Sequence, residues 1–287
     1  MHFDGLKRFD IILLSIDNIN KQKTMRKKVI VGLILALVLC LAWAGITSPV
    51  DAAYKQSHTR APAHVRGKIL LEVEGLGEAW YIEPVDGLRY YLGRPQDAFD
   101  IMRGLGLGAT HENIEKIPSP VHRHGSLEFA RRFSGRILID VDRYGEAWYI
   151  NPADLQGYYL GRPDDAFDIM RSTGLGARTD FIRNISPNVQ ITGIFYDGFW
   201  PREADEFVDI HNFGRMDVGM RNWTLKDEEG HTFVFPDVSL HRRENVRVYT
   251  GTGKYKFDYN WPIWNNDGDI AFLRASTGAL VDSYNYY

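Results

Sequence analysis

The residues best suited to contact a ligand in this sequence are aromatic pairs that occur in two copies. They are Trp80, Tyr81, Tyr90 and Tyr91 in the first copy and Trp148, Tyr149, Tyr158 and Tyr159 in the second. Aromatic faces stack on sugars and bases, and a stack on a base is worth about 1–3 kcal/mol. Successive residues of a strand face opposite sides, so we expect one ring of each pair in the core and the other facing out. The sequence therefore predicts core packing for at least half of these rings and allows a stacking platform among the rest.

An arginine stands directly before the first proline of a predicted helix in both copies. Arg94 and Arg162 could hold an anion together with the helix N-terminus. Asp97 and Asp100 already lie near that end of the first helix, where acidic side chains are stabilised. An ion pair within the unit is therefore the favoured interpretation, and anion binding is the alternative.

The histidines and the loop at residues 265–269 give no metal motif. Linker histidines 122 and 124 have no carboxylate beside them, and histidines 211, 231 and 241 lie in or beside predicted strands. Residues 265–269 have the composition of a calcium loop but lack the bidentate glutamate that such a loop needs. We expect a hairpin turn there, and we predict no metal and no cofactor.

A duplication positions the aromatic pairs. The segment that starts at Gly67 aligns without a gap with the segment that starts at Gly135, a constant offset of 68 residues, and most aligned residues are identical. Each copy predicts three short strands and one helix. The helix begins at Pro95, carries an apolar stripe at Ala98, Ile101, Met102 and Leu105, and is followed by Gly106 as a predicted left-handed cap.

The pattern changes after residue 189. Seven short alternating segments follow one another with glycine, asparagine or aspartate turns between them, and no helical period is present. They cover residues 191–196, 206–211, 223–226, 232–235, 246–249, 270–273 and 280–284. This spacing predicts a β-sandwich.

The sandwich segment resembles the lamin tail domain, an Ig-like sandwich. The residues that carry the resemblance are 205–214, 222–227, 230–236, 246–251, 263–269 and 278–284, in order and with matching spacing, apart from Asp209 where a glutamate is more usual. The resemblance implies a non-catalytic accessory domain of the type attached to exported prokaryotic surface enzymes, with an association with DNA suggested for the class. The duplicated segment is similar to repeats of bacterial envelope proteins, some of which stand beside wall-modifying enzymes.

The N-terminal segment has the order of an export signal. Residues 25–28 are basic, residues 29–46 are apolar, and Val50 and Ala52 fit the −3 and −1 positions of a cleavage site. The apolar run also reaches the lower limit for a spanning helix, so cleavage and retention as an anchor are both open. Cys40, the single cysteine, lies inside this run, so disulfides are excluded after cleavage. We therefore predict a secreted or cell-surface protein.

These observations give a multi-domain organisation of two small α+β repeats followed by an all-β Ig-like sandwich. The predicted divisions are an N-terminal extension with signal or anchor (1–53), a linker (54–66), repeat 1 (67–117), a basic linker (118–134), repeat 2 (135–186) and the sandwich (189–287).

The sequence favours a binding function over catalysis. No motif of a serine hydrolase or nucleotide-binding loop is present, although a carboxylate pair that meets only in three dimensions would escape notice, so a hydrolase stays an alternative. A net charge of −3 argues against nucleic acid. The basic linker and Arg242-Arg243 still offer a patch for weak DNA contact. We predict a non-catalytic binding or anchoring protein that contacts cell-wall glycan or a surface protein.

Overall fold

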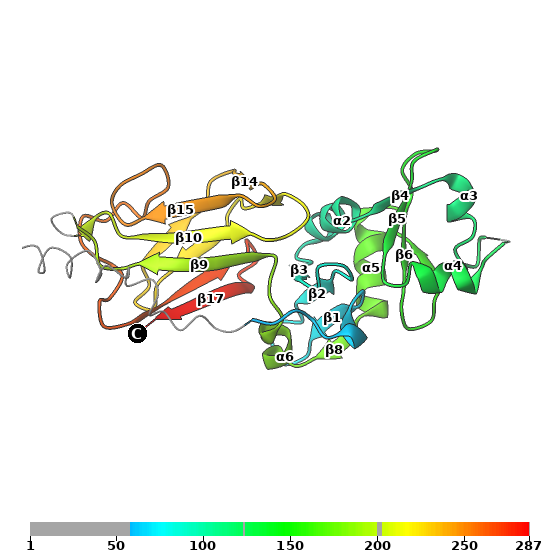
Figure 1. Ribbon diagram of the computed structural model, residues 1–287, viewed down its shortest axis with the longest axis horizontal. Helices are drawn as coiled ribbons and strands as arrows, with labels where there is room; N and C mark the ends of the chain where they lie inside the picture. Colours follow the sequence, from blue (N-terminus) through cyan, green and yellow to red (C-terminus); the bar gives the residue numbers. More distant parts are fainter. Residues whose placement is uncertain (1–57, 123, 200–202, 287) are drawn as a thin grey trace, which may run out of the picture. The chain divides into compact units, whose positions relative to one another are not determined.

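The computed structural model describes residues 58–122, 124–199 and 203–286 (Figure 1). The segment predicted as signal or anchor, with Cys40, lies outside the described residues. Among the residues that are described, no helix has the length and apolar character needed to cross a membrane. The described chain is mostly β, arranged in several sheets.

The two repeats have the same order of elements. Repeat 1 contains η2 (Ala63–Val65), β1 (Ile69–Glu72), β2 (Ala79–Ile82), β3 (Arg89–Tyr91), α2 (Pro95–Gly104), β4 (Leu107–Ala109) and α3 (His111–Ile114). Repeat 2 contains α4 (Leu127–Arg132), β5 (Ile137–Asp140), β6 (Ala147–Ile150), β7 (Gly157–Tyr159), α5 (Pro163–Thr173), β8 (Leu175–Ala177) and α6 (Thr179–Asn184). The prediction of three strands and one helix is therefore incomplete, because each repeat has a fourth strand and two further short helices, one before its first strand and one after its last.

The fourth strand of each repeat pairs with the sheet of the other repeat. One sheet has the order β3-β2-β1-β8 and the other has the order β4-β5-β6-β7 (Figure 1). The parallel pairings are equivalent, since Leu70 faces Leu175 in one sheet and Leu107 faces Leu138 in the other. Each sheet therefore has four strands where the sequence predicted three, and the fourth comes from the other copy.

One hydrophobic core serves both repeats. Helices α2 and α5 pack against each other, and their buried residues Ala98, Met102, Ala166 and Met170 join both sheets in one cluster. At the centre, a Cβ on Gly67 would lie 2.5 Å from the Cα of Gly135. Both glycines have positive φ, +79° and +77°, so backbone conformation and close approach both require the small residue there.

Gly106 has a different role from the predicted left-handed cap. Its φ is not positive, and helix α2 ends at the αR residue Leu105. A Cβ at Gly106 would instead collide with the side chain of Ile139 from the other repeat. The glycine is needed for close packing between repeats, which no local pattern reveals.

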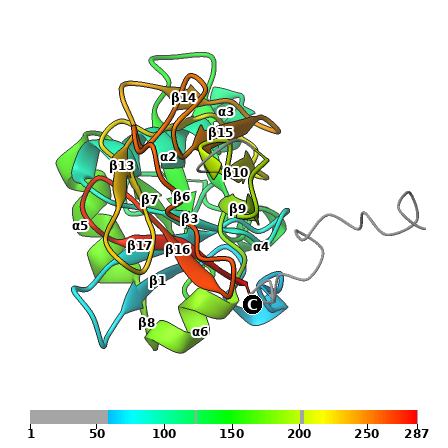
Figure 2. The same ribbon diagram turned by 90° about the vertical axis from the view of Figure 1, so that its left-hand side faces the viewer.

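The C-terminal segment forms a sandwich of β-sheets (Figure 2). Its strands are β9 (Val189–Phe195), β10 (Phe207–Asn212), β11 (Val218–Gly219), β12 (Thr224–Lys226), β13 (Thr232–Val234), β14 (Ser239–Leu240), β15 (Asn245–Tyr249), β16 (Asp269–Arg274) and β17 (Leu280–Tyr286). The sheets β15-β10-β9 and β13-β12-β16-β17 enclose one core, and β11 pairs with β14. All seven predicted strands are present, and the short pair β11 and β14 is additional.

A buried arginine of repeat 1 joins the repeats to the sandwich. The Arg89 guanidinium lies 4.3 Å from the Trp80 ring centroid, donates from Nε to the carbonyl of Ile185 at 2.7 Å, and donates from Nη2 to the carbonyl of Val281 at 2.7 Å. Gly157 stands at the equivalent position of repeat 2. The two copies therefore differ at one of the residues that contact the sandwich.

Candidate functional site

The paired Trp and Tyr rings of the second strands are buried on both faces of the sheets. Tyr81 and Tyr149 lie in the shared core, where their hydroxyls donate to the carbonyls of Gly135 at 2.6 Å and Gly67 at 2.8 Å. Trp80 and Trp148, on the opposite faces, are only 3% and 8% exposed. The expectation that one ring of each pair faces solvent is wrong for these strands.

Distant segments cover the outer faces. In repeat 1, Ala61, Val65 and the α6 residues Ile182 and Ile185 pack with Trp80. In repeat 2, Ile114 of α3, Ile117 and Ala130 of α4 pack with Trp148. A strand covered on both sides has no outward ring, so these four aromatic residues provide no stacking platform.

The Tyr-Tyr pairs of the third strands are placed unequally. Tyr90 is buried, and its hydroxyl donates to Asp86 at 2.7 Å and accepts from the Arg215 amide at 3.0 Å. Burial is the main cause that raises its pKa. In repeat 2, the half-buried Tyr158 donates to Asp154 at 2.7 Å.

The second tyrosine of each pair reaches the surface. Tyr159 is 45% exposed, and its ring centroid lies 5.2 Å from that of Trp148. Tyr91 is half-buried beside Trp80, and its hydroxyl forms a hydrogen bond of 2.7 Å with Thr277 of the sandwich. Of the predicted stacking residues, Tyr91 and Tyr159 offer the most useful ring surface.

The arginines before the helices form ion pairs inside their own repeats. Arg94 contacts Asp97 at 2.9 Å and Arg162 contacts Asp165 at 3.1 Å. The aspartate also accepts from the arginine backbone amide in each case, which closes the first turn of the helix. The ion-pair interpretation is confirmed, with Asp97 rather than Asp100 as the partner.

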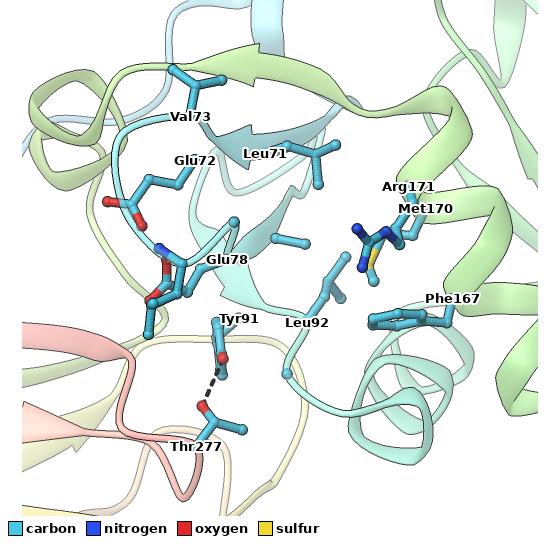
Figure 3. Close-up of a pocket in the computed structure, with 14 residues that line it drawn as sticks. Leu71, Glu72, Val73, Glu78, Tyr91, Leu92, Phe167, Met170, Arg171 and Thr277 are labelled. Carbon is cyan, nitrogen blue, oxygen red and sulfur yellow. Dashed lines mark hydrogen bonds between the residues drawn. The ribbon is translucent and has the colours of Figure 1, made fainter.

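A cavity of about 460 Å³ opens beside Tyr91 and is called the Tyr91 pocket below (Figure 3). Its lining comes from the β1–β2 hairpin, the segment after β3, helix α5 and the β16–β17 turn. The lining residues are Leu71, Glu72, Val73, Leu76, Gly77, Glu78, Ala79, Tyr91, Leu92, Gly93, Phe167, Met170, Arg171 and Thr277. Both repeats and the sandwich therefore contribute to it.

Two carboxyl groups lie together on one side of the Tyr91 pocket (Figure 3). Glu72 ends β1 and Glu78 precedes β2, and the hairpin pairs them through a backbone hydrogen bond of 2.9 Å. Burial and the neighbouring Glu72 carboxyl raise the pKa of Glu78. Its neighbour Glu78 lowers the pKa of Glu72, with help from Thr179, whose hydroxyl donates to Glu72 at 2.5 Å. The two neighbouring carboxyl groups therefore differ in how readily each ionises.

The opposite side of the pocket is cationic and aromatic. Arg171 and Phe167 of α5 line it, with the Arg171 guanidinium carbon 5.7 Å from the Phe167 ring centroid. Figure 3 shows Arg171 across the pocket from the glutamates, with Leu71 and Leu92 between them. The pocket therefore has an acidic end, an apolar middle and a basic end.

A second cavity of about 250 Å³ is also lined by Tyr91. Its charged lining residues are Arg94, Asp97, Asp100, Asp217 and Arg221, and Trp223 and Met216 add apolar surface. Tyr91 is therefore a wall of both cavities.

The equivalent region of repeat 2 is arranged differently. Arg103, the counterpart of Arg171, donates from Nη1 to the Gly145 carbonyl at 2.7 Å and so is bound to the hairpin. Asp140, the counterpart of Glu72, is held by the His111 ring at 2.6 Å. Burial raises the pKa of Asp140, but the hydrogen bond from His111 and its other partners outweigh burial and lower it.

The sequence prediction did not include Glu72, Glu78 or Arg171. The two glutamates flank a short hairpin, and a register derived from the alternation of Ile69 and Leu71 would have placed them opposite each other. Arg171 gave no such signal, because its helix reaches the pocket only through the exchange between repeats.

The histidines of the sandwich serve local contacts. Asp227, Glu229 and His231 place potential ligand atoms within 4.8 Å of one another. Asp227 already accepts from His231 Nδ1 at 2.5 Å and from the amides of Gly230 and His231. The carboxylate thus closes a turn, and its hydrogen bonds account for its position.

The loop at residues 265–269 forms a turn, closed by the Gly268 amide and the Asn265 carbonyl at 3.1 Å. It leads into β16, which does not pair with the preceding strand β15. The expectation of a turn is correct, but the hairpin is wrong.

Comparison with known proteins identifies the sandwich. Residues 184–287 match the family model described as Lamin Tail Domain. No curated protein matches the chain. The C-terminal segment is therefore similar to an Ig-like, non-enzymatic family of binding modules, as the resemblance of residues 189–287 predicts.

Proposed function

We propose that this chain is a non-catalytic surface protein that binds a cell-wall polymer in the two cavities beside Tyr91. The observation that carries the proposal is that Tyr91 lines both cavities, which take the rest of their lining from the repeats and the sandwich. A polymer can occupy adjacent cavities at once, and each occupied cavity adds to the affinity of the other. A mixed lining of apolar, aromatic and charged groups is typical of ligand sites.

The carboxyl pair favours binding over hydrolysis. In glycosidases the two catalytic carboxyl groups stand about 5–9.5 Å apart so that substrate or water fits between them. Glu72 and Glu78 instead stand side by side on one hairpin, paired through a backbone hydrogen bond of 2.9 Å. The match of the sandwich to a non-enzymatic family points the same way.

Location at the cell surface is part of the proposal. It rests on the basic and apolar order of residues 25–52, which is typical of an export signal. The polymer would then be met outside the membrane, and the apolar run would serve as an anchor wherever it is retained.

Co-sedimentation of purified residues 53–287 with isolated cell-wall polymer tests the proposal. Retention should fall at least about ten-fold in Tyr91→Ala, because the shared wall of both cavities is lost. Tyr159→Ala is the matched control in repeat 2 and should be retained like the unchanged chain. Equal loss in both variants, or none in Tyr91→Ala, would contradict the proposed site.

Duplex DNA at two salt concentrations forms a parallel arm. Phosphate-driven binding weakens steeply with salt. DNA retention that falls with salt, without retention on wall polymer, would replace the proposal with the DNA alternative. Retention on neither would point to a protein partner.

A further inference from the structure

We infer that the Tyr91 pocket recognises a group that carries a primary amine and a carboxylate on a short apolar stem. A lysine-like or other diamino-acid group has this chemistry. The inference rests on the proposed function in one respect, because it assigns this group to the cell-wall polymer. The chemistry of the pocket lining does not depend on the proposed function.

The two glutamates form the end of the pocket that would bind the amine. Glu72 and Glu78 both line the pocket, and the backbone hydrogen bond between them holds their two carboxyl groups at one end. An ammonium group has three donors and one positive charge, which suits two neighbouring carboxyl groups. Charge-assisted hydrogen bonds of this kind are stronger than neutral ones.

The middle of the pocket suits a hydrocarbon stem. Leu71 and Leu92 lie between its two ends, and Met170 is buried beneath the same lining (Figure 3). These side chains offer no hydrogen-bond partner apart from weak sulfur, so a polar middle segment would lose its water without replacement.

Arg171 lies at the end of the pocket that would bind the ligand's carboxylate. This exposed guanidinium lies over the Phe167 ring and lines the pocket opposite the glutamates. A guanidinium binds a carboxylate in a two-pronged geometry. Arg103 donates to a hairpin carbonyl. The Arg171 guanidinium is instead directed into the pocket (Figure 3).

The size of the cavity agrees with such a group. About 460 Å³ corresponds to roughly fifteen water molecules at their share of liquid volume. A six-carbon stem with charged ends fits this space and leaves room for ordered water.

Calorimetric titration of residues 53–287 with 6-aminohexanoate tests the inference. Hexylamine and hexanoate, each lacking one charged end, should bind at least about ten-fold more weakly, because one set of charge-assisted bonds is lost. Glu78→Gln and Arg171→Gln should each weaken the binding of 6-aminohexanoate by a similar factor of at least about ten. Glu146→Gln and Arg103→Gln, which change the counterparts of these residues at the repeat 2 hairpin, should leave the binding of 6-aminohexanoate unchanged.

Several outcomes would overturn the inference. One is that 6-aminohexanoate does not bind at millimolar concentration. Another is that hexanoate or hexylamine binds as tightly as 6-aminohexanoate. A third is that Glu146→Gln and Arg103→Gln weaken binding as much as Glu78→Gln and Arg171→Gln do. Circular dichroism of each variant separates a lost site from a lost fold.

Competition separates this inference from the proposed function. If wall polymer is retained and 6-aminohexanoate does not displace it, the function stands and the assignment of the ligand group fails. If 6-aminohexanoate binds to the pocket but wall polymer is not retained, the inference about the pocket's ligand group stands and the proposal that the protein binds wall polymer is contradicted.

Discussion

At the scale of single residues, Glu206 is the acidic group most strongly affected by burial in the sandwich. Its side chain is fully buried and accepts from the Thr250 hydroxyl at 2.8 Å and the Ile263 amide at 3.0 Å. Burial raises its pKa to about 7, although these hydrogen bonds oppose the change. The native state therefore binds the Glu206 proton more tightly than the unfolded chain does.

Glu206→Gln should increase stability at high pH and have little effect at low pH. An acid whose folded pKa is raised contributes its stability below the unfolded value, near 4.5, and loses it as pH rises through about 7. The gain in the free energy of unfolding should be about 2–3 kcal/mol at pH 8 and near zero at pH 4. Urea unfolding at both pH values measures it, with the exposed Glu229→Gln as control. A gain that is equal at both pH values would refute the titration argument.

Arg89 is a buried residue that joins repeat 1 to the sandwich. Burial lowers its pKa to about 10, so the guanidinium is still charged at neutral pH. Arg89→Met keeps the apolar bulk but leaves the carbonyls of Ile185 and Val281 without their donor. We expect a loss of about 3 kcal/mol. Calorimetry should show separate melting of repeats and sandwich; a single transition at unchanged temperature would contradict this role.

At the scale of elements, local patterns predicted the long helix of each repeat and most strands. The helix that begins at Pro95 and carries a stripe at Ala98 and Met102 is present as predicted. The strands β4 and β8 were missed because each is only Leu-Gly-Ala, and what makes them strands is a partner in the other repeat. The burial of Trp80 was missed for the same reason, since its cover comes from segments before and after the repeats.

Gly135→Ala should disrupt the contact between the two sheets. The new Cβ would lie 2.5 Å from the Gly67 Cα, and φ at this position is +77°. Gly77→Ala is the matched control, because its φ of +79° imposes the same backbone strain while nothing lies within 4 Å of its Cβ. Urea unfolding should show Gly135→Ala to be at least about 2 kcal/mol less stable than Gly77→Ala. Equal losses of stability in the two variants would mean that backbone strain alone, and not the collision with Gly67, destabilises the protein.

At the scale of the whole molecule, the candidate site comes from three separate regions of the chain. The hairpin of repeat 1 supplies Glu72 and Glu78, the helix of repeat 2 supplies Arg171, and the sandwich supplies Thr277. A pattern in one repeat can predict the aromatic residue Tyr91. It cannot predict which distant side chains meet it, because their meeting depends on the exchange of strands and on the contact with the sandwich.

The exchange of strands also predicts how one repeat behaves alone. Residues 58–118 contain β1 and β4, but in the full chain β1 pairs with β8 and β4 pairs with β5. Two copies of repeat 1 can form both pairings with each other, since Leu107 is the counterpart of Leu175 and Leu70 of Leu138. A monomer would leave a sheet edge unpaired and half of the shared core exposed.

Residues 58–118 should therefore sediment as a dimer at tens of micromolar and lose structure on dilution, because folding and association are coupled. Residues 58–188, which contain both repeats, should be a monomer with the same fold at every concentration and serve as the control. Sedimentation velocity gives the mass, and circular dichroism over a dilution series gives the fold. A folded monomer of residues 58–118 would mean that each copy closes its own sheet, and the strand exchange would then not be what stabilises the pair.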